Sequence, residues 1–71
     1  MDTMTPLRTL RLLRGFRLRD VSLGTSIYSS RISRLERGLV RPYKREIRAL
    51  ALFFSVQPEV IFPDGQELRE D

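Results

Sequence analysis

The chain has 71 residues and carries 13 basic against 9 acidic side chains, a formal net charge of +4. This length supports one domain with one small core, and leaves no room for a cleft between two lobes. Cys, His and Trp are absent, which excludes a disulfide framework, a thiolate nucleophile, a zinc finger and histidine-assisted catalysis. The composition therefore argues against an enzyme, and we expect no metal or other cofactor.

The apolar segments are short. None approaches the roughly 20 residues of a membrane span, and no basic-then-apolar signal segment opens the sequence. The acidic residues are scattered without a nucleophile–base pair, which again argues against catalysis. We therefore expect a cytoplasmic protein that has no membrane partner and no evident small-molecule ligand.

The basic residues are unusual in type and in distribution. Twelve of the thirteen are Arg, whose planar fork suits phosphate groups and guanine edges. Residues 1–58 hold twelve basic and four acidic side chains, a net +8, whereas residues 59–71 hold one Arg and five acids, a net −4. A GC-rich codon bias could produce the Arg excess, so the distribution is the more informative feature. A basic body with an acidic tail is the asymmetry expected of a nucleic-acid binder.

The first half of the chain predicts three short helices. Thr5 and Pro6 are suited to the start of the first helix, which Gly15 ends. Its apolar residues recur at helical spacing: Leu7, Leu10 and Leu13. The second helix is predicted over about residues 17–24 and the third over about 28–37, before Gly38. Their inward residues are Leu18 and Val21 in the second, and Ile32 and Leu35 in the third.

The second half predicts an extended link and two more helices. Pro42 keeps the residue before it out of the helical region. A fourth helix, over about residues 43–54, has the clearest amphipathic stripe, Ile47, Leu50, Ala51 and Phe54. A short fifth helix begins at Pro58. With no sustained alternation typical of strands, the sequence predicts a compact all-α domain of five helices over residues 1–63 and a short, acidic, flexible tail over residues 64–71.

The third predicted helix carries a recognisable motif. Its end reads ISRLERG over residues 32–38, and a proline follows at position 42. This stretch resembles the Cro- and repressor-like helix-turn-helix family, also called the xenobiotic-response-element type, and the resemblance covers roughly residues 7–63. It implies a lambda-repressor-like DNA-binding domain whose second and third helices form the helix-turn-helix. It also implies a transcriptional repressor or regulator that binds specific double-stranded DNA sequences, with the third helix in the major groove.

Three positions depart from the family pattern. Leu18 stands where the family usually has Gln, a residue that braces the recognition helix and touches phosphate. Ser22 and Ser26 replace the Ala of the second helix and the Gly of the turn that the family prefers. Arg17 and Arg19, on either side of Leu18, are the candidates to replace the missing phosphate contact.

A helical wheel separates the inward and outward residues of the third helix. With Ile32 and Leu35 inward, the outward residues are Ser29, Ser30, Ser33, Arg34 and Arg37. The resemblance assigns the first four to base reading. Arg34 is the candidate for a bidentate guanine contact, worth about 1–3 kcal/mol of discrimination. Each serine, taken singly, is equally compatible with plain solvation at a helix N-terminus.

Phosphate contacts are predicted for seven side chains in or beside this unit: Arg17, Arg19, Arg31, Arg37, Arg41, Tyr43 and Lys44. The last two open the fourth helix, where free backbone N–H groups favour a phosphate. Any one arginine is equally well explained as a solvated surface charge, but the clustering is not. The resemblance further implies a structural, partly buried ion pair between Arg11 and Glu36.

Surplus apolar residues suggest a second subunit. The candidate dimer contacts are Leu39, Val40, Leu52, Phe53, Ile61 and Phe62. The alternative for Phe53 is that it completes the core. A homodimer, weak or formed on DNA, would place two recognition helices about 34 Å apart on a palindromic operator.

The main alternative to DNA binding is a protein-interaction module. In this interpretation the helix-turn-helix scaffold docks on the transcription machinery or a toxin partner. The serine-rich recognition positions and Leu18 are compatible with it. Salt dependence distinguishes the two functions, because affinity for DNA falls steeply as salt rises.

Overall fold

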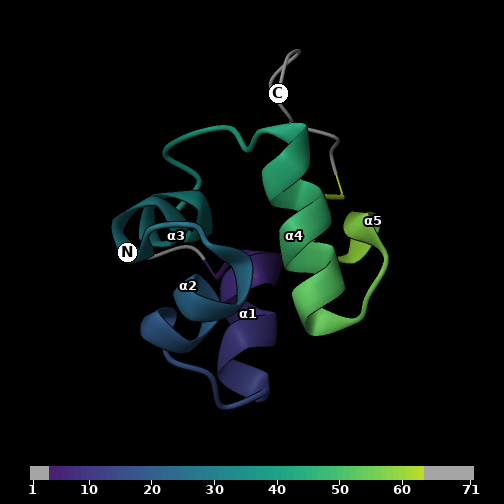
Figure 1. The fold of residues 1–71 in the computed structure, drawn as a ribbon. Helices are drawn as coiled ribbons and strands as arrows, with labels where there is room; N and C mark the ends of the chain where they lie inside the picture. Colours follow the sequence, from purple (N-terminus) through teal and green to yellow (C-terminus); the bar gives the residue numbers. More distant parts are fainter. Residues whose placement is uncertain (1–3, 64–71) are drawn as a thin grey trace.

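The computed structural model describes residues 4–63, which form five helices and contain no strand (Figure 1). The helices are α1 (Pro6–Leu13), α2 (Leu18–Thr25), α3 (Ser29–Glu36), α4 (Lys44–Phe54) and α5 (Pro58–Ile61). The predicted all-α class is confirmed, and the helix bounds lie close to those predicted. The proposed acidic tail at 64–71 lies outside the described residues. Within those residues, no helix has the length and apolar character needed to cross a membrane.

Side chains and a glycine define the two ends of α1. The Thr5 hydroxyl oxygen accepts the Arg8 N–H at 3.3 Å and donates to the Glu36 carbonyl at 2.6 Å, which ties the start of α1 to the end of α3. Gly15 follows the helix with a φ of 75°, in the left-handed region that glycine adopts without strain.

A three-residue turn, 26–28, joins α2 to α3. Ser26 ends α2 with a φ of 63°, a left-handed conformation that is costly for a residue with a Cβ. Ile27 is buried, and its N–H donates to the Thr25 hydroxyl at 3.3 Å. The left-handed backbone of Ser26 and the burial of Ile27 thus define the turn, and α2 and α3 pack against one another.

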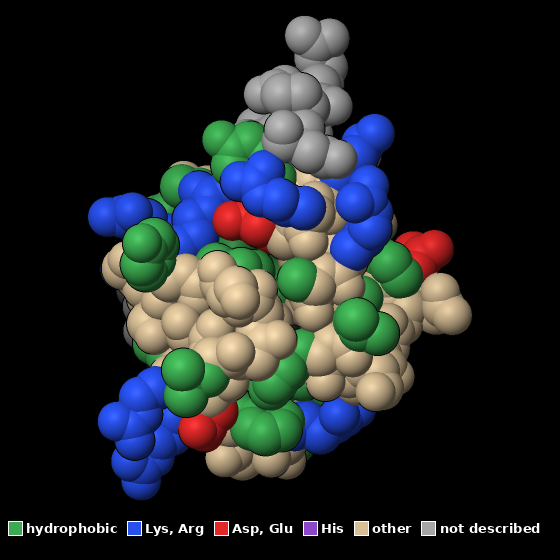
Figure 2. Space-filling model, in the orientation of Figure 1, with side chains coloured by type: hydrophobic (Ala, Val, Ile, Leu, Met, Phe, Trp, Pro, Cys, Tyr) green, Lys and Arg blue, Asp and Glu red, His purple; other side chains and the backbone are tan. Residues whose placement is uncertain are grey.

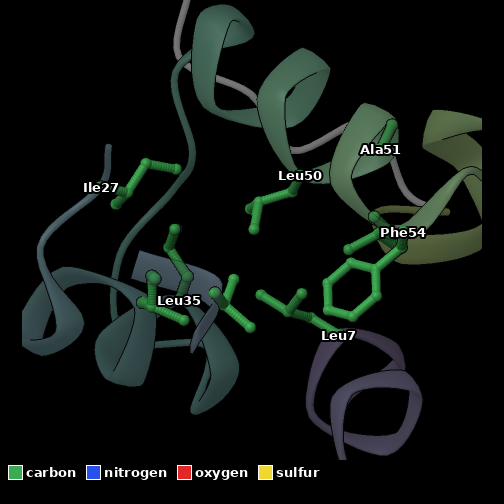
Figure 3. Packing of buried hydrophobic residues seen from close by; sticks show 9 residues of the cluster. Leu7, Ile27, Leu35, Leu50, Ala51 and Phe54 are labelled. Atoms are coloured by element: carbon green, nitrogen blue, oxygen red, sulfur yellow. The ribbon is translucent and has the colours of Figure 1, made fainter. Parts of the chain in front are cut away.

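The core gathers side chains from all five helices (Figure 3). Its buried apolar residues are Leu7, Val21, Ile27, Ile32, Leu35, Leu50, Ala51, Phe54 and Ile61. Beside it lies an aromatic cluster in which the ring of Phe53 is 5.0 Å from those of both Phe16 and Phe54. Gly24 lies directly against the Phe53 ring, so α2 and α4 approach closely at a point where an added Cβ would force that ring to move.

The three leucines at helical spacing in α1 do not share one environment, because the Leu13 side chain is 79% exposed. Successive i+3 steps fall about 60° short of a full turn, so Leu13 lies about 120° around the helix from Leu7. Leu7 is buried and Leu10 packs partly against the core, whereas Leu13 turns to the surface.

Candidate nucleic-acid interface

The outer face of α3 carries serine and arginine side chains. Ser30 and Arg34 are exposed, Ser29 and Ser33 are half-buried, and the opposite face buries Ile32, Leu35 and Glu36. Arg37 follows the helix as an exposed C-cap residue. The structure therefore places the four residues predicted to read bases on the solvent side of α3, with Ser30 and Arg34 the most accessible.

Exposed cations flank this face on two sides. Arg17 and Arg19 lie at the start of α2, Arg41 lies in the link between α3 and α4, and Lys44 opens α4. Figure 2 shows Lys and Arg side chains gathered around the start of α4 and its link, and a second group near the start of α2. These positive charges could contact two separate stretches of phosphate backbone.

Arg31 lies in a different environment from the other predicted phosphate contacts. Its Nε and Nη2 each donate at 2.9 Å to the carboxylate of Glu46, and Nη2 also donates to the Arg41 carbonyl at 3.0 Å. The side chains of Arg31 and Glu46 are 24% and 8% exposed. The structure thus corrects the picture of Arg31 as a free phosphate-binding cation, because a carboxylate of the protein itself already neutralises its charge.

The start of α4 is also less open to a phosphate than predicted. The Tyr43 N–H donates to Glu46 Oε1 at 2.8 Å, so one of the N–H groups at this helix start already has an acceptor. The guanidiniums of Arg31 and Arg45 lie 5.3 Å and 4.7 Å from the centre of the Tyr43 ring, within cation–π range. The exposed ammonium of Lys44 remains accessible there.

The carboxylate of Glu46 is strongly stabilised in its charged form. Burial alone would raise its pKa. The hydrogen bonds from Arg31 and from the Tyr43 N–H, with the charges of Arg31 and Arg45, outweigh burial and hold the pKa of Glu46 below its ordinary value of 4.5. The hydrogen bond to Glu46 and the negative charge of Glu46 raise the pKa of Arg31, against the opposing effect of burial. Sequence reasoning missed this ion pair. The only signal was the position of Glu46 three residues after Tyr43, which is the spacing of a capping box.

The structure also brings Arg11 and Glu36 together. Arg11 Nε contacts Glu36 Oε2, and Nη2 donates to Oε1 at 3.1 Å. Nη1 donates to the Phe16 carbonyl at 2.9 Å. The two side chains are 11% and 5% exposed, so the pair is largely shielded from water. It anchors the last turn of α3 to α1 and to the loop after it.

The candidate dimer contacts differ in their exposure to solvent. Ile61 is 2% exposed and belongs to the core, so its prediction as a dimer contact is wrong. Phe53 packs within the aromatic cluster. Val40 and Phe62 line a 250 Å³ hollow together with Ile61. Leu39 in the link and Leu52 in the last turn of α4 are exposed singly.

Leu18 and its two neighbours lie in different environments. It is half-buried and packs against the core, whereas its neighbours Arg17 and Arg19 are exposed. The Asp20 carboxylate accepts the Arg17 N–H at 2.8 Å and so caps α2. The start of α2 is therefore closed by the packing of Leu18 and by the Asp20 cap, and its cations are exposed to solvent.

No family model, curated protein or solved structure matches this chain. In residues 4–63 no three metal-ligating side chains gather where they could hold an ion.

Proposed function

We propose that this protein binds specific sequences of double-stranded DNA as a transcriptional regulator, most simply a repressor. In this proposal the domain is lambda-repressor-like, α2 and α3 form its helix-turn-helix, and α3 enters the major groove. Arg34 is the guanine contact, and Ser29, Ser30 and Ser33 are the adaptable polar contacts to neighbouring bases.

The observation that carries the proposal is the separation of charges around α3. Residues 4–63 hold twelve basic and four acidic side chains. Glu36 and Glu46 are buried in ion pairs, and Asp20 caps α2. Three of the four acids are thus engaged in ion pairs or a helix cap, and the fourth, Glu59, is exposed on α5. Arg34, the other exposed cations beside α3 and those at the start of α2 face solvent. A polyanion that inserts beside α3 would meet positive charge on both sides.

The salt dependence of binding to a duplex tests this proposal. Five exposed cations are the proposed phosphate contacts: Arg17, Arg19, Arg37, Arg41 and Lys44. Five contacts predict a slope of about −4.5 for log K against log salt, or about a 500-fold loss of affinity between 50 and 200 mM salt. Lys44→Ala should make the slope less negative by about 0.9.

The matched control is Arg48→Ala. It removes the same charge from the outer side of α4, beside Leu52, and should leave the slope unchanged. Negligible affinity for DNA at 50 mM salt would contradict the proposal and favour the protein-interaction module.

We further propose that two copies bind a palindromic operator. The support is the exposed Leu39 next to the half-buried Val40, in the link that follows the recognition helix. A two-fold pair would present two α3 helices about 34 Å apart. Sedimentation of the protein with its selected duplex should give two copies per operator, and one copy would contradict the dimer.

A further inference from the structure

One ion pair connects the middle of α3, the first turn of α4 and the link between them. The Arg31 guanidinium donates to the Glu46 carboxylate through two nitrogens, and Nη2 also donates to the Arg41 carbonyl. Glu46 Oε1 in turn accepts the Tyr43 N–H. The two peptide groups on either side of Pro42 are therefore both bonded to this pair.

The surroundings keep this arrangement in place. Pro42 is fully buried, and the carboxylate of Glu46 has little exposure to water. The Tyr43 ring lies within cation–π range of Arg31 and Arg45, on the wall of a groove of about 660 Å³ between the α2–α3 turn and α4. A side chain of α3, Arg31, thus holds the Arg41 end of the link, and a side chain of α4, Glu46, holds the Tyr43 end.

This arrangement bears on the candidate DNA contacts. Arg31 and Arg34 are three residues apart, one turn along α3, and the Arg31 side chain holds the backbone of Arg41. The same side chain therefore fixes where the exposed Arg41 stands relative to the base-reading Arg34. Sites that require several simultaneous contacts depend on such supporting groups.

We propose that Arg31 and Glu46 are a positioning pair, which sets the link so that Arg41 reaches a DNA phosphate while Arg34 lies in the major groove. This proposal rests on the DNA-binding function. Neither residue contacts DNA in it. Glu46, an acid, then strengthens the binding of a polyanion through the geometry that it maintains.

The direction in which one substitution changes the affinity for DNA distinguishes positioning from simple attraction. Glu46→Gln removes a negative charge close to the interface, so attraction alone predicts tighter binding to DNA. Positioning predicts about a tenfold weaker affinity for a pool of random-sequence duplexes, the loss expected for one charge-assisted contact, and a salt slope less negative by about 0.9.

Two other variants complete the experiment. Glu59→Gln makes the same charge change on the exposed surface of α5 and should not weaken binding. Arg31→Lys keeps the positive charge but cannot reproduce the forked contacts to Glu46 and the link, so it should weaken binding as Glu46→Gln does. Circular dichroism first verifies that each variant retains its helices. If Glu46→Gln unfolds, the affinity of Arg31→Lys for DNA decides the outcome.

Tighter or unchanged binding by Glu46→Gln, or full affinity of Arg31→Lys, would overturn the positioning role while the DNA-binding function stands. Failure of the wild-type protein to bind the duplex pool at 50 mM salt would overturn both. Amide exchange of the free protein gives a readout without DNA. The Tyr43 N–H should exchange faster in folded Glu46→Gln than in wild type, and equal rates would contradict the role assigned to Glu46.

Discussion

The ion pair between Arg11 and Glu36 should contribute far more to stability than a surface pair does. Replacing Arg11 with Met leaves the Glu36 carboxylate, 5% exposed, without its cation, and removes the donor to the Phe16 carbonyl. Removing one partner of a buried pair costs about 3–5 kcal/mol. Because the Arg11 side chain is still 11% exposed, we expect the free energy of unfolding to fall by the lower value of this range, about 3 kcal/mol.

Urea denaturation measures this loss. A domain of this size has an m value of about 1 kcal/mol per molar urea, so a loss of about 3 kcal/mol in Arg11→Met should lower the midpoint by about 3 M. Because this loss is a large share of the stability of so small a domain, the measurement should begin at low temperature, where the variant retains structure. Glu59→Gln, an exposed charge change on α5, is the control and should shift the midpoint little.

A double-mutant cycle then isolates the interaction. Arg11→Met with Glu36→Leu removes both charges and fills the space with apolar groups, so the double variant should be more stable than the sum of the two single losses predicts. A loss below about 1 kcal/mol for Arg11→Met, or strictly additive single losses, would refute the reasoning, since these are the values for a pair exposed to water.

Three further changes test the packing and the electrostatics. Gly24→Ala gains helix propensity but places a methyl group against the Phe53 ring, so the free energy of unfolding should fall by about 1–2 kcal/mol; a raised melting temperature would contradict the close approach of α2 and α4. Ser26→Gly removes the strain of a left-handed serine and should stabilise the domain by about 1 kcal/mol, measured by urea denaturation, and a loss would contradict it. Glu46 has a lowered pKa when folded, so its contribution is present above pH 4.5 and is lost as the pH falls through its folded pKa. The stability difference between wild type and Glu46→Gln should therefore shrink below pH 4.5, and a difference that stays constant from pH 7 to pH 3 would refute the role of the charged carboxylate.

Hydrophobic periodicity predicted the helices well. Of the predicted stripe, Leu50, Ala51 and Phe54 are buried, whereas Ile47, one turn before Leu50 and Ala51, is only half-buried. Gly15 and Gly38 follow the helices that they were predicted to end. These features depend on local spacing and backbone conformation, which a sequence expresses directly.

Features that depend on how helices dock were harder to predict. Val60, Ile61 and Phe62 are consecutive apolar residues at a four-residue helix, and only the angle at which α5 docks decides that Ile61 is the buried one. The ion pair of Arg31 with Glu46 depends likewise on the path of the link, which brings together residues fifteen positions apart. In contrast, Arg11 and Glu36 were named through a family resemblance, and the structure places them in contact.

Selection of bound sequences from a random duplex pool at physiological salt tests the DNA-binding claim most directly. The account predicts an enriched, palindromic motif, and predicts that Arg34→Ala loses preference for one guanine in each half-site, by about 1–3 kcal/mol, while it keeps the rest of the motif. No enriched motif with the folded wild-type protein would contradict the account.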